Sequence, residues 1–343
     1  MKNGEKRKFN KKALIAIVLC AAIVFGIVAY DFASGRSSSE KTTVAMGTIV
    51  TIKLFGFGTQ NELEKVESEI NGLENSVLSW RKKGSDIYRI NEGAGGDVSV
   101  SPDTVNILGQ CIEISGKCNG VFDVTIGNVT KLWDFGGNNQ RLPTSNEIKS
   151  ALTNVGYKNV TVSGKSVQIK KGQALDLGAV GKGFACDKIK ELLQKGKTKS
   201  AIVSVGGSLL IYGNRTFSVG IVNPDNDGQS MGTLKLRDVC VSTSGSYEKF
   251  FEQDGKTYHH ILNATTGYPA TSEFKSVTVV SDSGLLSDAL STVCFIVGYR
   301  KSIEILKQYD AEAVFIFKNN AVKVTDGLSN KFSVTDDSFN LDK

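Results

Sequence analysis

Histidine is almost absent from this sequence. The 343 residues include two, His259 and His260, which are adjacent. Histidine has the unperturbed pKa closest to neutrality and is the most frequent general acid or base. Any histidine-dependent chemistry must therefore occur at this one place, within residues 241–292, which also carry several small polar motifs.

Most of the chain also lacks an excess of either charge. The formal net charge is +6, but residues 1–12 contain six basic side chains and one acidic one, which leaves about +1 for the remainder. A nucleic-acid-binding protein needs its basic excess as a patch on the folded domain. We therefore expect no nucleic-acid partner.

Cysteine is too sparse and too scattered to form a disulfide framework. The six cysteines are Cys20, Cys111, Cys118, Cys186, Cys240 and Cys294. Cys111 and Cys118 lie seven residues apart on a predicted helix, roughly 10 Å along its axis, which is too far for a disulfide. We expect reduced cysteines that pack as small hydrophobic residues.

The sequence shows neither an internal repeat nor a series of βαβ units. Hydrophobic residues (40%) and charged residues (22%) are present in ordinary globular proportions. Helical patterns alternate irregularly with strands that read as antiparallel, which indicates an α+β fold. We expect one domain over residues 42–335, with mixed or antiparallel sheets and flanking helices.

The amino-terminal segment predicts a membrane anchor. A basic tail at 1–12 precedes an uncharged apolar run at 13–30, which as a helix would span roughly 27 Å. A cleavable signal segment is the alternative. Basic residues before the run place the amino end in the cytoplasm. We expect an anchor in the cytoplasmic membrane, a polar linker at 31–41 and an extracytoplasmic domain.

Local patterns predict several element boundaries. Two residue pairs match the capping box that opens a helix, Thr59 with Glu62 and Thr144 with Glu147. The run at 121–125 resembles a short strand interrupted by one acid.

A glycine-rich loop precedes a helix predicted at 184–194. Gly178, Gly181 and Gly183 give the pattern G-x-x-G-x-G, in which backbone N–H groups could meet a phosphate. The pattern is neither the dinucleotide fingerprint nor a P-loop, and a purely structural turn explains it equally well. Asp176, just before the loop, could accept a hydrogen bond from a ligand or cap the turn.

A second motif combines a carboxylate with a hydroxyl. Asp288 and Thr292 lie one turn apart on the same face of a helix predicted at 285–297. Their oxygens suit Mg²⁺, although an acid in the first turn also simply complements the helix dipole. In a strand, His259 and His260 would point to opposite faces, so one of them at most can serve this site.

Eight motifs in order resemble the ApbE family of FAD:protein FMN transferases over about residues 44–317. They read M-G-T, L-S-W-R with S-D-I-Y-R-I-N, F-D-V-T-I-G, L-D-L-G-A-V-G-K-G-F-A-C-D, V-S-V-G-G, V-S-T-S-G-S-Y-E-K-F-F, Y-H-H-I-L-N-A-T-T-G-Y-P-A and S-D-A-L-S-T. The family usually carries Asp-Pro where this sequence has Asn263 and Ala264, which leaves the pKa tuning of His260 open.

The resemblance implies a site for Mg²⁺ and for FAD as substrate. Asp288 and Thr292 would bind Mg²⁺ through their side chains, with backbone oxygens of Ala179 and Ser291. His260 would be the catalytic base. The implied FAD contacts are Met46, Trp80, Val121, Phe122, Asp123, Asp176, Lys182 and Ile261.

The implied reaction is Mg²⁺-dependent transfer of FMN from FAD to a threonine hydroxyl of an acceptor flavoprotein, with release of AMP. Two alternatives remain open. An FAD pyrophosphatase would release FMN and AMP without an acceptor, and a noncatalytic flavin-binding protein would form no covalent product.

Overall fold

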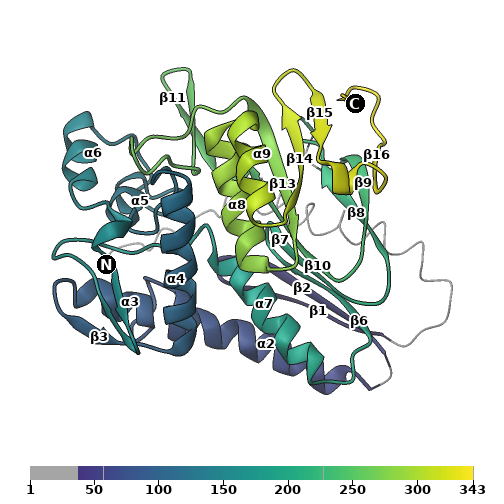
Figure 1. Cartoon of the computed structure of the whole chain (residues 1–343), viewed down its shortest axis with the longest axis horizontal. Coiled ribbons are helices and arrows are strands. Elements are labelled where there is room, and N and C mark those ends of the chain that lie inside the picture. The colour runs from purple at the N-terminus through teal and green to yellow at the C-terminus, as the bar shows by residue number, and fades with distance from the viewer. Residues whose placement is uncertain (1–37, 57, 227, 343) are drawn as a thin grey trace, which may run out of the picture.

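The computed structural model describes residues 38–56, 58–226 and 228–342, and its centre is a nine-stranded sheet (Figure 1). Its strands run in the order β1 (Ser38–Ala45), β2 (Thr48–Phe55), β6 (Ser200–Val205), β7 (Ser208–Gly213), β10 (Val239–Gly245), β13 (Phe274–Ser281), β14 (Glu312–Phe317), β15 (Ala321–Val324) and β17 (Asn340–Leu341). Every neighbouring pair is antiparallel except β15 with β17. The predicted α+β class with a mixed sheet is confirmed.

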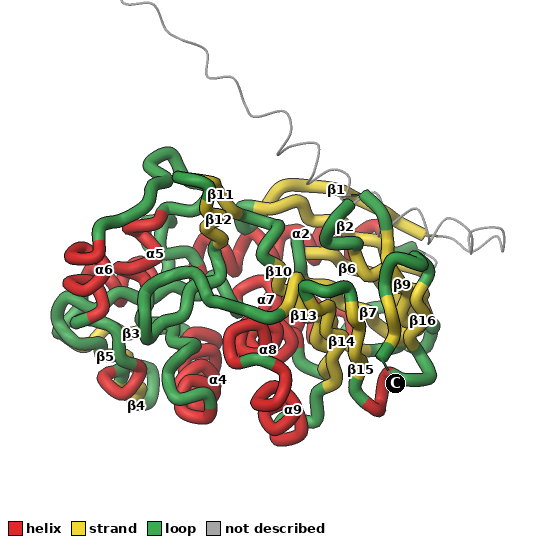
Figure 2. The backbone as a smooth tube through the Cα atoms, turned by 90° about the horizontal axis from the view of Figure 1, so that it is seen from above, coloured by secondary structure: helices red, strands yellow, loops and turns green. Residues whose placement is uncertain are grey.

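Each face of this sheet is covered by a different layer (Figure 2). Helices α2 (Gln60–Leu73), α7 (Gly181–Gln194), α8 (Gly284–Val297) and α9 (Tyr299–Gln308) lie on one face, and the small sheet of β8 (Phe217–Val222), β9 (Ser230–Leu236) and β16 (Phe332–Val334) lies on the other. Strand β6 shows why: Ala201 and Val203 pack toward α2 and α7, whereas Ile202 packs toward β8 and β9. Alternating apolar residues thus bury both faces.

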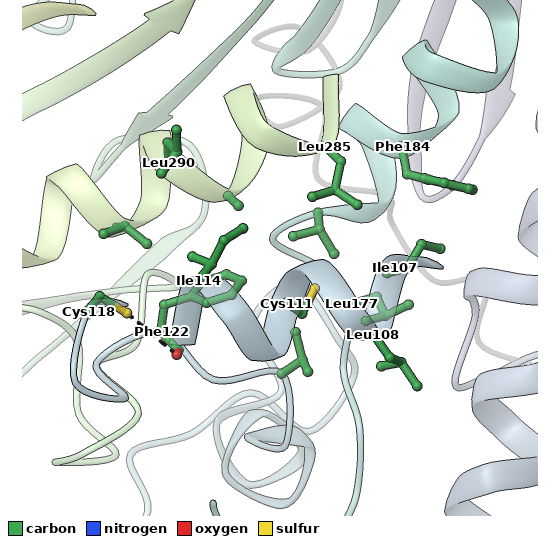
Figure 3. Close-up of a cluster of buried hydrophobic side chains, with 14 of the residues drawn as sticks. Ile107, Leu108, Cys111, Ile114, Cys118, Phe122, Leu177, Phe184, Leu285 and Leu290 are labelled. Carbon is green, nitrogen blue, oxygen red and sulfur yellow. Dashed lines mark hydrogen bonds between the residues drawn. The ribbon is translucent and has the colours of Figure 1, made fainter. Parts of the chain in front are cut away.

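A second group of helices and strands packs against α8 and forms the other half of the molecule. It contains η2 (Glu74–Leu78), α3 (Asp86–Glu92), α4 (Pro102–Lys117), α5 (Gly127–Trp133), α6 (Ser145–Leu152), η3 (Tyr157–Asn159) and the sheet of β3 (Asp97–Ser99), β5 (Ser166–Gln168) and β4 (Thr161–Ser163). Cys111 and Ile114 of α4 belong to the same buried cluster as Leu285 and Leu290 of α8, and Figure 3 shows Leu285 pointing from α8 toward α4. This shared core fixes the two halves relative to each other.

A short hairpin of β11 (Phe250–Gln253) and β12 (Lys256–His259) projects beside these helices. Its side chains Phe251 and Tyr258 pack on the fully buried Trp133, with ring-centroid distances of 6.3 and 5.6 Å. Strand β12 ends at His259, so His260 begins the loop that follows. The last helical turn, η4 (Asp326–Leu328), lies between β15 and β16.

The capping predictions had opposite outcomes. Thr144 and Glu147 form the predicted capping box at the start of α6. The box predicted for Thr59 and Glu62 is wrong, because Glu62 instead accepts hydrogen bonds from Lys197 N at 2.5 Å and Thr198 N at 3.0 Å. This carboxylate joins α2 to the segment before β6, a contact between residues remote in sequence.

The strand predicted at 121–125 is also wrong. Asp123 accepts hydrogen bonds from the backbone of Thr125 at 2.8 Å and of Tyr157 at 2.7 Å, and these bonds hold the segment as a loop. The predicted helix at 184–194 starts earlier, at Gly181, so two of the glycines of the preceding motif belong to α7.

The described residues revise the predicted domain limits. Strand β1 begins at Ser38, so the end of the linker predicted at 31–41 is wrong, and the domain extends past residue 335 because Phe339 is buried in the core. The basic tail at 1–12 and the apolar run at 13–30 lie outside the described residues. Within those residues, no helix has the length and apolarity to cross a membrane.

The five cysteines of the described residues are reduced and buried, as predicted. Cys20 lies outside this part of the chain.

Candidate active site

A cleft of about 490 Å³ opens between the two halves of the molecule. Of the thirteen predicted site residues, the eleven that line it are Met46, Trp80, Phe122, Asp123, Asp176, Ala179, Lys182, His260, Ile261, Asp288 and Thr292. Val121 and Ser291 are not among the lining residues. Segments from almost the whole domain therefore converge on one site.

Two glycines bring the carboxylate and the lysine of this cleft together. A Cβ atom on Gly183 would lie 2.0 Å from the carbonyl oxygen of Gly284, and one on Gly284 would lie 2.2 Å from that of Gly183. The backbones of α7 and α8 therefore touch, which no side chain at either position would allow. At this crossing, Gly183 N donates a hydrogen bond to Asp288 Oδ2 at 3.0 Å.

Asp187 holds the amino end of α8 against α7. Its carboxylate accepts hydrogen bonds from Gly284 N at 2.5 Å, Leu285 N at 2.8 Å and the Ser283 hydroxyl at 3.1 Å. Burial raises the pKa of Asp187, and these hydrogen bonds oppose the rise by favouring the carboxylate. The carboxylate thus satisfies free N–H groups of the first helical turn.

Three of the expected metal ligands, Asp288, Thr292 and Ala179, line the same cleft. Asp288 is 4% exposed, and Lys182 Nζ lies 3.4 Å from both of its carboxylate oxygens. Thr292 Oγ1 lies 3.2 Å from Ser244 Oγ. The described residues contain no cluster of three histidine, cysteine or acidic side chains. One carboxylate, one hydroxyl and the nearby backbone of Ala179 fit Mg²⁺, which keeps several waters.

The raised pKa of Lys182 shows that the space beside Asp288 favours positive charge. Burial opposes its charged form, but the carboxylates of Asp288 and Glu248 outweigh burial and raise the pKa of Lys182. Its ammonium also donates to Gly178 O at 3.2 Å.

Ser291, the fourth expected metal ligand, is set back from the cleft. It is fully buried, and its hydroxyl donates to Asp288 O at 2.9 Å and pairs with Ser244 Oγ at 2.8 Å. The side chain braces α8 against β10. Because Ser291 does not line the cleft, nothing in this geometry supports the expected metal contact of its backbone oxygen.

The two histidines are in different environments. His259 Nδ1 accepts a hydrogen bond from Ile261 N at 3.3 Å, which leaves Nε2 to donate to Ala270 O at 3.1 Å. Burial lowers the pKa of His259, so its neutral ring is a structural element. His260 lines the cleft, and its buried Nδ1 has no hydrogen-bond partner.

The electrostatics of the cleft keep His260 neutral. Burial, followed by the charges of Lys249 and Lys182, lowers the pKa of His260 to about 3. Its backbone N–H donates to Lys249 O at 2.9 Å, which joins the main chains of the two residues. A neutral imidazole can accept a proton at neutral pH.

Met46 and Trp80, two of the expected FAD contacts, line the cleft. Met46 has a left-handed backbone (φ 53°) in the turn between β1 and β2, and its N–H donates to Glu74 Oε2 at 2.8 Å. The Arg81 guanidinium lies 3.8 Å from the centre of the Trp80 ring. The indole therefore already carries a planar cation on its face.

Three predicted FAD contacts also have local structural roles. Besides its backbone bonds, Asp123 accepts a hydrogen bond from the Thr125 hydroxyl at 2.7 Å, and burial raises its pKa. Asp176 Oδ1 accepts from Gly178 N at 2.8 Å, which fits the turn-capping interpretation. Val121 O accepts a hydrogen bond from Ala264 N at 3.0 Å.

The hydrogen bonds of Asn263 and Ala264, which stand where the family usually has Asp-Pro, go to residues other than His260. Asn263 Oδ1 accepts hydrogen bonds from Thr265 N at 2.9 Å and the Thr265 hydroxyl at 2.7 Å, so it forms the turn that an aspartate would form. The N–H of Ala264, which a proline would lack, bonds to Val121.

Sequence reasoning missed several residues of the cleft, chiefly Glu248 and Lys249, and Arg81. Glu248 and Lys249 stand in the Y-E-K motif that carried the resemblance, and Arg81 follows Trp80. The motifs therefore contained these residues, but only the fold shows that their charges line one cleft with His260.

Comparison with known proteins agrees with this geometry. The model of the ApbE family matches residues 46–315. The chain is 30% identical to the FAD:protein FMN transferase of Treponema pallidum (strain Nichols), over 96% of this chain and 98% of that protein. It is also 30% identical to the FAD:protein FMN transferase of Klebsiella pneumoniae (strain 342), over 88% of this chain and 96% of that one.

Solved structures share the fold. The ApbE protein of Thermotoga maritima superposes with a TM-score of 0.79 at 29% identity, covering 85% of this chain and 98% of that one. The apo flavinyl transferase ApbE of Pseudomonas stutzeri gives a TM-score of 0.76 at 24% identity, covering 88% and 98%. Because the family model and these relatives span most of its length, the chain belongs to the ApbE family.

Proposed function

We propose that this chain is an FAD:protein FMN transferase, which moves FMN from FAD to a threonine hydroxyl of an acceptor flavoprotein and releases AMP. The observation that carries the proposal is the shared cleft, in which an unpaired neutral His260 lies with Lys182 and the buried carboxylate of Asp288. Family membership supports flavin transfer, and this arrangement supports the role of each residue.

Asp288, Thr292 and the backbone of Ala179 would hold Mg²⁺ in this cleft. The ion would supply neutralisation of the charge that develops on the phosphates during phosphoryl transfer. The chain's own contribution is to fix these oxygens through the contact of Gly183 with Gly284.

The remaining chemistry falls to His260. It accepts the proton of the threonine hydroxyl, while the hydroxyl oxygen forms a bond to the phosphorus on the FMN side of FAD. The bond from that phosphorus to the bridging oxygen breaks, and AMP leaves with this oxygen. Phosphoryl transfer depends mainly on positioning and charge stabilisation, and Lys182 lies where it can contribute both.

We also propose that residues 13–30 anchor the enzyme in the cytoplasmic membrane, with the catalytic domain outside. The basis is the uncharged run that follows a basic tail. Membrane fractionation of the full chain tests this, and recovery of a shortened chain without 1–30 would indicate a cleaved signal segment instead.

The reaction is tested with the full chain, FAD, Mg²⁺ and a purified acceptor domain that carries one threonine in a Ser/Thr- and Gly/Ala-rich motif. We expect in-gel flavin fluorescence on the acceptor and one AMP for each flavin attached. A Thr→Ala acceptor is the control. AMP release without acceptor would identify a pyrophosphatase, and stable bound flavin without AMP or covalent product would identify a flavin-binding protein.

A further inference from the structure

Four basic side chains from three segments line the cleft around His260, namely Lys182, Arg81 with its neighbour Lys82, and Lys249. Lys182 comes from α7, Arg81 follows η2, and Lys249 precedes β11. Lys182 is engaged by Asp288, and Arg81 stacks on Trp80. Lys249 is tied to the histidine by its own backbone, since its carbonyl accepts the His260 N–H at 2.9 Å.

We propose that Lys249 binds the diphosphate of FAD and that this contact makes His260 a stronger base once the substrate has arrived. The inference rests on the proposed function and assigns a role to a residue that the family motifs left without one. Lys249 is a substrate contact and, through its hydrogen-bonded backbone, a positioning residue for His260.

The charges that face the cleft explain the coupling. Lys249 interacts with the positive charges of Lys182 and Arg81 and with the negative charges of Glu248 and Asp176. Each of these acids has another partner near it: Glu248 acts on Lys182, and Asp176 accepts a hydrogen bond from Gly178. A diphosphate, which carries about two negative charges near neutral pH, would therefore find Lys249 available.

In the absence of substrate, positive charge disfavours protonation of His260. Lys249 is the largest charged contributor to this effect, followed by Lys182 and then by His259. The carboxylates of Glu248, Asp176 and Asp288 line the same cleft. An anion bound to Lys249 cancels part of the repulsion, because nearby opposite charges favour the protonated form. Proton acceptance is thereby linked to occupancy of the site.

The two histidines make this measurable by NMR, because the spectrum contains two imidazole Hε1 signals and His260→Ala identifies one of them. ADP serves as a diphosphate probe without flavin, and riboflavin as a flavin probe without phosphate. In Lys249→Met we expect the His260 titration midpoint to rise by at least 0.5 pH units, an order-of-magnitude expectation for the loss of one adjacent charge.

Binding gives the second readout. Lys249→Met should weaken ADP binding by about tenfold, which is the loss of one charge-assisted contact, and leave riboflavin binding unchanged. Lys249→Arg should restore ADP binding. Lys149→Met, which removes a positive charge from the exposed side of α6, is the matched control and should change neither readout.

Unchanged ADP affinity together with an unchanged His260 titration in Lys249→Met would overturn the proposal. An equal loss of ADP and riboflavin binding would also overturn it, because it would indicate a structural role. Neither readout requires an acceptor protein. Failure of flavin transfer by the wild-type chain would therefore count against the proposed function, but it would not affect the outcome of this test of Lys249.

Discussion

At the scale of single residues, Asp288 serves two neighbours with one carboxylate. The carboxylate accepts a hydrogen bond from the Gly183 N–H and faces the Lys182 ammonium. Both contacts require an oxygen atom on the side chain of residue 288. Asp288→Asn keeps the shape and one oxygen but loses the charge. We expect metal-dependent transfer to fall at least about 100-fold, with little change in melting temperature.

The assay for Asp288→Asn is in-gel flavin fluorescence across a series of Mg²⁺ concentrations. Asp103→Asn is the control, since it removes a half-buried carboxylate outside the cleft, whose partner is Lys188. Wild-type rates with an unchanged Mg²⁺ requirement in Asp288→Asn would rule out this residue as the metal ligand.

The adjacent histidines should separate chemistry from stability. His260→Ala is expected to bind FAD and lose transfer by about 10²- to 10⁴-fold, the usual contribution of a general base. His259→Ala should retain transfer but lose about 1–3 kcal/mol of unfolding free energy, because it leaves Ile261 N–H and Ala270 O without their partner. Urea unfolding and single-turnover transfer measure the two effects. Equal losses of transfer in both variants would contradict this assignment.

The sequence alone located most of the site residues, but it did not show that some of them also form local hydrogen bonds that hold the backbone. Asp123 and Asp176 could be placed at the site by their motifs, whereas their bonds to Thr125 and Gly178 depend on backbone geometry. Lys249 illustrates the limit, because its Y-E-K motif does not reveal that the residue lines the same cleft as His260. Charge neighbours across a cleft come from tertiary structure, and no local pattern encodes them.

At the scale of elements, the contact between α7 and α8 sets the geometry of the site. Gly183→Ala would place a methyl group 2.0 Å from the carbonyl oxygen of Gly284, so the helices must separate. We expect a loss of about 1–3 kcal/mol, as for other overpacked positions, and weaker Mg²⁺ binding. Gly109→Ala in α4 is the control, because nothing lies within 4 Å of its added methyl. There we expect a gain of about 0.5–1 kcal/mol.

Thermal unfolding with and without Mg²⁺ measures both glycine variants. If Gly183→Ala is as stable as the wild type and binds Mg²⁺ equally well, the helix contact does not set the site.

Elements were predictable where their signals are local. The capping box of Thr144 and Glu147 could be predicted in full, because its two residues lie three positions apart in the sequence. Glu62 has the same spacing from Thr59, but the backbone of Thr198 competes successfully for its carboxylate. Asp187 looked like an ordinary helix residue because its partners, at the start of α8, lie almost a hundred positions later.

At the scale of the whole molecule, the two histidines give stability a pH dependence. Folding lowers both pKa values, from 6.5 to about 3 for His260 and by burial for His259. The unfolded chain therefore binds more protons than the folded one as the pH falls below about 6.5, and stability decreases in that window. Each histidine contributes a slope of up to about 1.4 kcal/mol per pH unit.

Urea unfolding between pH 7.5 and 4.5 measures this slope, and His260→Ala should make it shallower. Glu62 and Asp86 have lowered pKa values, so they also make the protein less stable as the pH falls, at more acidic pH. Their contribution is the same in the variant and the wild type, so it cancels in the difference between the two curves. Parallel curves for the variant and the wild type would show that His260 is not held neutral by the fold.

The overall class was predictable, but the order of strands was not. Irregular alternation of helices and strands already indicated α+β. Strand β2 pairs with β6, about 150 residues later, and this pairing depends on which apolar faces fit together. The short β17 could not be foreseen either, since its two residues pair in parallel with β15.

The position of Trp80 gives the protein an internal optical reporter. The chain has two tryptophans: Trp133 is fully shielded inside the hydrophobic cluster under the hairpin, while Trp80 borders the cleft. An isoalloxazine ring that arrives beside the half-buried indole of Trp80 would quench its emission and leave that of Trp133 almost unaffected. Replacing Trp133 with phenylalanine would then make substrate arrival visible in real time, without a label.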